Sequence, residues 1–145
     1  MSAVAVQIPP TLALPSRLDA MGGARTWLDA HARIAGFDPV ASSELQLALT
    51  EALSNVIRHS YRSADNETIL LSVLVDADTL TLTVRDFGDK FYRATLRSVD
   101  LGSPQVGGYG VYFIEALMDE VEWDTSVEQG NLLRMVRLRA SGPRG

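Results

Sequence analysis

The chain has 145 residues, of which 46% are hydrophobic and 21% are charged, and its formal net charge is −5. This composition predicts one folded domain at residues 1–140 with a disordered tail at 141–145, and no apolar run approaches the roughly 20 residues of a membrane span. The acidic balance argues against direct binding of nucleic acid, and the absence of cysteine excludes disulfides and thiolate metal sites.

The N-terminal region lacks the basic segment of a secretory signal peptide, so a cytoplasmic location is expected. Residues 3–9 alternate and predict a short edge strand that ends at Pro9 and Pro10. A helix should follow from Ser16, its candidate N-cap, to Gly36, its candidate stop. Its expected apolar stripe consists of Leu18, Met21, Trp27, Leu28 and Ile34.

A second helix is predicted after Pro39, with Ser42 or Ser43 as its N-cap, and it should extend to about Ser60. At 100° per residue, one arc of this helix is apolar and should face the core. That arc contains Leu45, Leu49, Ala52, Leu53 and Val56.

The second half of the chain is mainly a strand region. Residues 67–76 and 79–86 predict two strands joined by a tight turn, and a loop of about twenty residues then runs from Phe87 to Val106, a length typical of functional loops. A glycine-initiated helix follows, with an apolar stripe of Val111, Ile114, Leu117 and Met118. Two last strands are expected at 120–125 and 132–140.

This order of elements predicts an α+β fold. Strands that follow one another through short turns are antiparallel, so the expected architecture is a two-layer sandwich with a mostly antiparallel sheet and helices on one face. The aromatic residues Trp27, Phe113 and Trp123 are expected in its core. A solvated final strand and tail should carry the C-terminal arginines Arg134, Arg137, Arg139 and Arg144.

Beside its apolar arc, the second helix carries a polar arc with Glu44, Glu51, Asn55 and Arg58. One interpretation is a surface ion pair between Glu51 and Arg58, with Asn55 merely tolerated. The alternative is functional, since a carboxylate can accept a proton from a hydroxyl and an amide oxygen can ligate Mg²⁺. The helix by itself leaves both interpretations open.

Two further features point towards a ligand. Strand alternation places Asp86 at the end of the buried row of residues 79–86, where it either begins a turn with Gly88 or accepts a hydrogen bond from the exocyclic amine of a purine. The glycines Gly107, Gly108 and Gly110 open a helix after the long loop, and free N–H groups at a helix start favour an anion.

Three segments in this order resemble the ATP-binding domain shared by gyrase, MutL, histidine kinases and heat-shock chaperones. They are "ELQLALTEALSNVIRHSY", "VRDFGDKF" and "GGYGVYFIEALMDEVEW". More narrowly, "EALSN…HSY", "DFGDKF" and the last segment resemble the small bacterial serine kinases of the RsbW and SpoIIAB type. The resemblance covers nearly the whole chain.

The resemblance implies ATP or ADP and Mg²⁺ as cofactors and assigns a role to each motif. Glu51 would be the general base, Asn55 would ligate Mg²⁺, and Asp86 would accept the adenine amino group. Gly88 would allow close approach of the base, and the hinge and phosphate-binding end of a lid would be Gly107, Gly108 and Gly110.

Two departures from the family pattern concern the nucleotide. No arginine directly precedes "GGYG", where some relatives use one to reach the γ-phosphate. Leu132 stands where many relatives have a threonine near the adenine. The basic residues that could replace the missing arginine are Arg58, Lys90, Arg93 and Arg97.

By the same resemblance, the expected function is that of an ATP- and Mg²⁺-dependent serine/threonine kinase in a partner-switching circuit. Its substrate would be a STAS-domain anti-sigma-factor antagonist, and it would also sequester a sigma factor or another regulator. The resemblance also implies a homodimer. The alternative is a nucleotide-sensing sequestering module with little or no kinase activity. An ATPase fragment of histidine-kinase type is disfavoured because no phosphoacceptor helix is visible.

Overall fold

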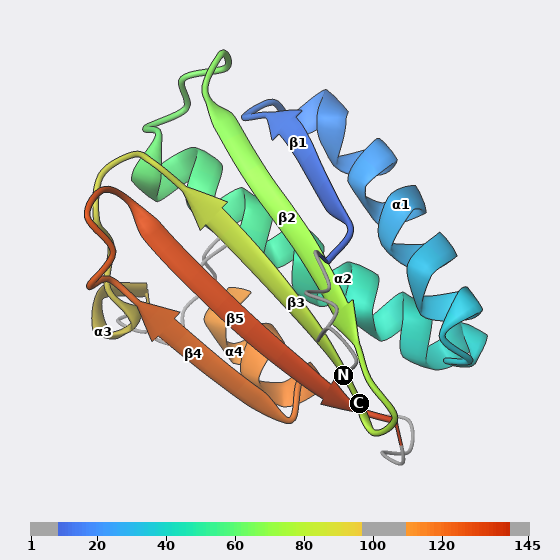
Figure 1. The fold of residues 1–145 in the computed structure, drawn as a ribbon. Helices are drawn as coiled ribbons and strands as arrows, with labels where there is room; N and C mark the ends of the chain where they lie inside the picture. Colours follow the sequence, from blue (N-terminus) through green and yellow to red (C-terminus); the bar gives the residue numbers. More distant parts are fainter. Residues whose placement is uncertain (1–8, 97–109, 140–145) are drawn as a thin grey trace, which may run out of the picture.

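The structure is a computed structural model that describes residues 9–96 and 110–139 (Figure 1). The second predicted helix continues without a break from an α-helix into one turn of π-helix, η2. In chain order the elements are β1 (Thr11–Pro15), the 3₁₀-helix η1 (Leu18–Ala20), α1 (Met21–Ile34), α2 (Pro39–Asn55), η2 (Val56–Ser60), β2 (Thr68–Val75), β3 (Thr79–Asp86), the one-turn helix α3 (Arg93–Leu96), α4 (Gly110–Leu117), β4 (Glu120–Asp124) and β5 (Asn131–Leu138).

The strands form one five-stranded sheet in the order β1-β2-β3-β5-β4, and every neighbouring pair is antiparallel. Figure 1 shows α1, α2 and α4 together on one face of this sheet. The predicted α+β two-layer sandwich is therefore confirmed.

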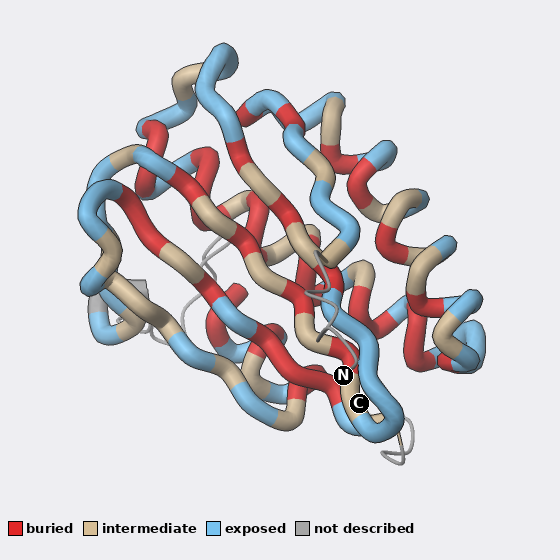
Figure 2. Tube along the Cα trace, in the orientation of Figure 1, coloured by how far each residue is buried: buried red, intermediate tan, exposed pale blue. Residues whose placement is uncertain are grey.

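Strand β3 shows how the sheet faces its helical layer. Leu80, Leu82, Val84 and Asp86 are buried, whereas the residues between them are only half-buried. Figure 2 shows this alternation as changes of colour along the central strands. The row predicted from the sequence is confirmed, and it brings a carboxylate to the end of an apolar row.

The strand predicted at residues 3–9 lies almost entirely outside the described residues and stays a prediction. The first described strand is Thr11–Pro15, after Pro9 and Pro10. It pairs with β2 at the edge of the sheet. Prolines are tolerated before an edge strand because no ladder hydrogen bond is needed there.

Both predicted helix N-caps are wrong. Ser16 instead donates from Oγ to the carbonyl of Ala64 at 2.5 Å and accepts from the N–H of Glu67 at 3.1 Å. The cap of α2 is Asp38, whose Oδ1 accepts from the N–H of Ala41 at 2.7 Å, and Pro39 fills the first helical position. An aspartate before a proline is a good start signal for a helix, because the carboxylate caps free N–H groups and proline fits the first helical position.

The apolar stripe of the first helix was predicted correctly only in part. Met21 and Leu28 are buried, but Leu18 and Ile34 are 70% and 86% exposed. Two small residues of α1, Ala24 and Ala32, are buried as well. Gly36 has φ +91°, which a glycine adopts without strain, so the predicted stop is confirmed.

The three aromatic residues predicted in the core are buried to different extents. Phe113 is 40% exposed, so its prediction is wrong. Trp27 and Trp123 are partly buried and pack against the core. The stripe predicted for the glycine-initiated helix, by contrast, is entirely buried: Val111, Ile114 and Leu117 on α4, and Met118 directly after it.

The expectation of a solvated final strand is wrong at Arg137, which is fully buried. Its Nη1 donates to the carbonyl of Leu117 at 2.7 Å, and its Nη2 lies 3.2 Å from Oε1 of Glu44. One guanidinium on β5 thus contacts the last residue of α4 and a carboxylate on α2. The contact holds two helices of the layer against the sheet.

Among residues 9–96 and 110–139, the structure contains no helix that is long and apolar enough to cross a membrane. The predicted tail at 141–145 lies outside the described residues.

Candidate active site

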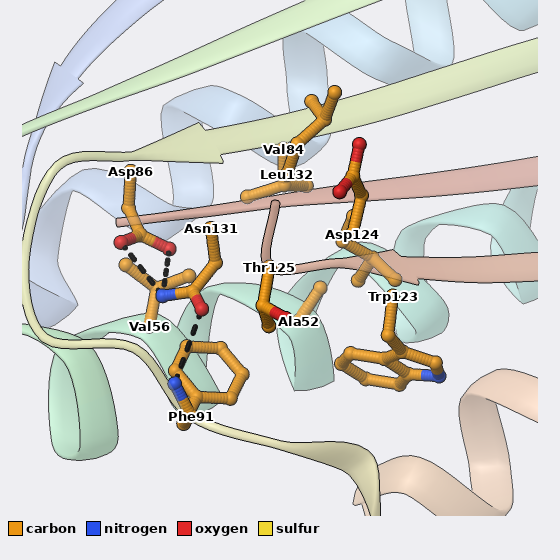
Figure 3. A pocket seen from close by; sticks show the side chains of 11 residues that line it. Ala52, Val56, Val84, Asp86, Phe91, Trp123, Asp124, Thr125, Asn131 and Leu132 are labelled. Atoms are coloured by element: carbon orange, nitrogen blue, oxygen red, sulfur yellow. Dashed lines mark hydrogen bonds between the residues drawn. The ribbon is translucent and has the colours of Figure 1, made fainter. Parts of the chain in front are cut away.

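A pocket opens between α2 and the ends of β3, β4 and β5 (Figure 3). Its cavity volume is about 10 Å³, and about 300 Å³ is free of atoms when the open solvent at its mouth is included. Its wall is mainly apolar, with a few polar groups towards the strand ends. The lining residues are Ala52, Val56, Val84, Asp86, Phe91, Trp123, Asp124, Thr125, Asn131, Leu132 and Leu133.

Asp86 is the buried acid of this pocket, with 1% of its surface exposed. Its Oδ1 accepts from Ser60 Oγ, from the N–H of Gly88 at 3.2 Å and from Asn131 Nδ2 at 3.1 Å. Burial raises the pKa of Asp86, and the hydrogen bonds from Ser60, Asn131 and Gly88 act against that rise. The carboxylate is therefore held by donors on three separate segments.

The turn of π-helix at the end of α2 brings Ser60 to Asp86. Single π-turns are rare and occur often at functional sites, where they redirect side chains. Here Ser60 is buried and bonded to the carboxylate across the helix–sheet boundary. The predicted extent of this helix, to about Ser60, is confirmed.

Gly88 packs tightly against this turn. A β-carbon there would lie 2.5 Å from the carbonyl oxygen of Ser60 and 2.7 Å from Cδ1 of Tyr61, so no larger residue fits. This contact gives a structural reason for the glycine. Its expected closeness to a bound base stays a prediction.

Glu51, Asn55 and Gly110 lie together at the last turns of α2. A β-carbon on Gly110 would be 3.0 Å from Oε2 of Glu51 and 3.4 Å from Nδ2 of Asn55. Asn55 is only 4% exposed, yet its Nδ2 has no hydrogen-bond partner among the described residues. A buried amide without a partner fits a site that a ligand completes. Gly107 and Gly108 lie outside the described residues.

The surface ion pair considered for Glu51 and Arg58 is not found in the part of the chain that the structure describes. Both residues instead line an open groove between η1 and the end of α2. The Glu51 side chain therefore has two surroundings. Its carboxylate lies against Gly110, and the residue also lines this groove. The other groove residues are Ser16, Arg17, Leu18, Asp19, Ser54, Ile57, Ser63 and Asp65.

The basic residues considered for the γ-phosphate have different surroundings. Lys90 Nζ donates to the carbonyls of Thr125 and Val127, each at 2.6 Å, and to that of Gly130 at 3.1 Å. An ammonium has three N–H donors, so this geometry leaves none for a phosphate. Lys90 therefore closes the loop between β4 and β5, which does not fit the expected nucleotide contact.

Arg93 is also engaged, because it forms a two-nitrogen ion pair with Glu115 on α4 at 2.8–3.0 Å. Arg58 is exposed and makes no ion pair among the described residues. Arg97 lies outside them. Of the candidates that the structure describes, Arg58 is the one whose guanidinium is available.

Sequence reasoning missed Asn131 and Ser60, the two side chains that donate to Asp86. The position singled out near the adenine was Leu132. The polar residue at the start of β5 that contacts Asp86 is its neighbour Asn131. An available signal was the amide directly after Gly130, at the head of an apolar strand. For Ser60 no local pattern marks a bond to a residue 26 positions away.

No group of three or more His, Cys, Asp or Glu side chains suitable for a metal occurs among residues 9–96 and 110–139. The unsatisfied atom of Asn55 is the donor Nδ2, which cannot bind a metal, so the role of Asn55 as a Mg²⁺ ligand stays a prediction.

Comparison with known proteins adds independent information. A family model described as a histidine kinase-like ATPase domain matches residues 14–137. The serine-protein kinase RsbW of Listeria monocytogenes serotype 4a is 32% identical over 121 residues, which cover 77% of this chain and 76% of that protein. The protein of the same name from Bacillus licheniformis is 32% identical over 134 residues, covering 85% and 81%.

Among solved structures, the crystal structure of the RsbU and RsbW domains of a Mycobacterium tuberculosis protein matches with a TM-score of 0.61 at 18% identity. The match covers 89% of this chain and 32% of that one, so this chain corresponds to about a third of the larger protein. At this identity the likeness shows the fold alone.

Proposed function

Because the chain belongs to the histidine kinase-like ATPase family and, within it, to the serine-protein kinases of the RsbW type, we propose that it transfers the γ-phosphoryl group of ATP to a serine of a partner protein. The observation that carries this proposal is Asp86, a buried acid at the end of β3 that lines a mainly apolar pocket. Asn55 on α2 lies beside Gly110 rather than in that pocket, and its Nδ2 is buried without a hydrogen-bond partner among the described residues.

The purine would occupy the pocket in front of Asp86. Its amino group would donate to the carboxylate, and the apolar wall provided by Val84, Phe91 and Trp123 suits the faces of an aromatic base. A carboxylate held by several donors keeps its direction, which favours one orientation of the base. This supports Asp86 as the residue that anchors the nucleotide.

Asn55 would hold Mg²⁺ through its amide oxygen, and the first N–H groups of α4, beginning at Gly110, would face the phosphates. When bound, Mg²⁺ neutralises part of the charge on the phosphate oxygens. Gly107 and Gly108 are proposed to belong to the same phosphate-binding turn. The small size of Gly110 keeps this space open beside Glu51.

Glu51 would act as the general base for the acceptor. In the proposed step its carboxylate takes the proton of the serine hydroxyl, the serine oxygen forms a bond to the γ-phosphorus, and the bond from that phosphorus to the β,γ-bridging oxygen breaks, releasing ADP. The position of Glu51 between the start of α4 and the open groove supports this role, since the acceptor can approach from the groove. Arg58 lines the same groove and would stabilise charge on the transferred group.

The proposed acceptor is a STAS-domain anti-sigma-factor antagonist, and the proposed second partner is a sigma factor or an equivalent regulator. The family assignment supports both. We further propose that ADP and ATP bias the choice between these partners, that the protein acts in the cytoplasm, where ATP is supplied, and that it forms a homodimer.

The test compares Glu51→Gln and Asn55→Ala with the unaltered protein. Binding of an ATP analogue is titrated with and without Mg²⁺, and transfer of labelled γ-phosphate to a STAS-domain protein is followed. Glu51→Gln should retain analogue affinity within about threefold but lose at least 10²-fold in transfer rate, because only the base is removed. Asn55→Ala should lose the Mg²⁺-dependent part of the binding.

Equal transfer rates for Glu51→Gln and the unaltered protein would refute the role of Glu51 as base. If the protein binds nucleotide but transfers no phosphate even when unaltered, it is a nucleotide-sensing sequestering module instead. If it binds no nucleotide, the purine site itself is wrong.

A further inference from the structure

Asn131, the first residue of β5, connects the purine-facing acid with the segment that follows β3. Its Nδ2 donates to Asp86 Oδ1 at 3.1 Å and Oδ2 at 3.3 Å, and to the carbonyl of Asp89 at 2.9 Å. Its Oδ1 accepts from the N–H of Phe91 at 3.1 Å. Figure 3 shows the bonds to Asp86 and to Phe91. Asn131 is 5% exposed, and both ends of its amide are in use, so it holds its neighbours and is not free to contact a ligand itself.

The two oxygens of Asp86 are not equivalent. Oδ1 accepts from Ser60, Gly88 and Asn131. Among the described residues, Oδ2 accepts only the longer bond of 3.3 Å from Asn131. Oδ2 is therefore the oxygen with acceptor capacity left for a ligand.

From this geometry we propose that Asn131 makes the pocket select a 6-amino purine over a 6-oxo purine by keeping Asp86 a pure hydrogen-bond acceptor. This inference rests on the proposed nucleotide site. An ionised carboxylate only accepts hydrogen bonds, so it favours an amino group and repels a carbonyl oxygen. A protonated carboxyl group can donate, so it would bind a 6-oxo purine as well.

The groups around Asp86 set the balance between its ionised and its protonated state. Burial raises its pKa, whereas the donors Ser60 and Asn131, the N–H of Gly88 and the positive charge of Arg85 lower it. The other titratable groups nearby are Tyr61, whose own pKa burial raises, Asp124, which lines the same pocket, and Asp89, which is paired with Arg62. Asn131 is one of only two side chains that bond to the carboxylate among the described residues, so its loss shifts the balance towards the neutral acid.

The test measures affinities for ATP and inosine triphosphate by calorimetry at pH 6, 7 and 8. The unaltered protein should prefer ATP by about 10²-fold or more, since a site built around a buried acceptor rejects a base that lacks the donor. Asn131→Leu should reduce this preference about tenfold, and more at pH 6 than at pH 8. Asn131→Thr, which keeps a donor, should retain most of the preference.

Asn131→Asp provides a second variant of nearly unchanged shape if the leucine variant does not fold. It places a second carboxylate against Asp86, so the pair should share a proton and the preference for ATP should fall further. Asn131 has only a structural role if both affinities fall by the same factor in these variants and their ratio does not change with pH. If the unaltered protein binds neither nucleotide, the proposed site is overturned and this inference with it, whereas binding with an unchanged ratio overturns the role of Asn131 alone.

Discussion

Gly110, the first residue of α4, lies directly against Glu51 of α2, so that a β-carbon on Gly110 would stand 3.0 Å from Oε2 of Glu51. This is tighter than an ordinary van der Waals contact, but the neighbour is the end of a half-buried side chain that can move by a few tenths of an ångström. A methyl group at residue 110 should therefore displace the proposed base without unfolding the protein.

We expect Gly110→Ala to lower the rate of phosphoryl transfer by about tenfold or more, because small displacements of a positioned group are costly in catalysis. The thermal midpoint should stay within a few degrees. Gly23→Ala is the matched control, since a β-carbon there meets nothing within 4 Å and alanine is favoured in a helix. The idea is contradicted if both variants transfer phosphate at the unaltered rate.

The buried contact of Arg137 with Glu44 and Leu117 predicts a large loss of stability on truncation. Arg137→Ala leaves the Glu44 carboxylate at 8% exposure without this guanidinium and removes a donor from the end of α4. We expect a loss of about 3–5 kcal/mol in the free energy of unfolding, measured by urea denaturation. Loss of a buried pair is costly because the remaining charge stays out of water.

Arg134→Ala is the matched control on the same strand. Arg134 is exposed and lies 4.0 Å from Glu122, so its removal should change the free energy of unfolding by less than about 0.5 kcal/mol. Similar effects of the two variants would show that the buried contact contributes no more than a surface pair.

The sequence predicted those features that depend on periodicity. Alternation along residues 79–86 identified the buried row that ends at Asp86, and helical spacing put Glu51 and Asn55 one turn apart beside the core. These patterns are local, and burial of an apolar face enforces them. The antiparallel sheet followed from the short connections between strands.

Features that depend on a single tertiary partner could not be read in this way. In the sequence, Arg137 cannot be distinguished from an exposed arginine on a strand. Its partner Glu44 lies on α2, 93 positions away in the chain. From the sequence, Lys90 is a reasonable candidate for a phosphate ligand. In the structure its ammonium donates instead to three carbonyls in the loop of residues 125–130. A long charged side chain reaches many possible partners, so its sequence position does not determine the one that it binds.

Removing the charge of Lys90 and removing that of Arg58 should have different effects on stability and on transfer rate. We expect Lys90 to stabilise the fold and Arg58 to contact a phosphate. Lys90→Met keeps the apolar stem but removes three donors, so it should lower the free energy of unfolding by about 1 kcal/mol, a modest value because the ammonium is exposed. Arg58→Ala should leave that free energy nearly unchanged and should lower the transfer rate. Urea denaturation and the transfer assay are run on both variants.

If Lys90→Met retains full stability but weakens ATP binding, the ammonium contacts the nucleotide after all. If Arg58→Ala transfers phosphate at the unaltered rate, the available guanidinium has no part in the reaction.

Asp86 predicts a dependence of stability on pH. Burial raises the pKa of Asp86 in the folded protein above 3.8, the value of an exposed aspartate, so between these two values the folded state binds more protons than the unfolded state. Its contribution to stability is then fully present below pH 3.8 and is lost as pH rises through the folded pKa. Above the folded pKa, the ionised acid is thus retained at a cost in stability, which fits a group kept for binding.

Asp86→Asn removes this titration while keeping the size of the side chain. Relative to that variant, the unaltered protein should lose stability as pH is raised from 3.8 through the folded pKa of Asp86, as measured by urea denaturation at several pH values. Ser60→Ala supplies a second check, because loss of its hydrogen bond should raise the pKa of Asp86 further and extend the loss to higher pH. A difference between the unaltered protein and Asp86→Asn that is constant with pH, or that grows in favour of the unaltered protein as pH rises, would mean that burial does not dominate at Asp86.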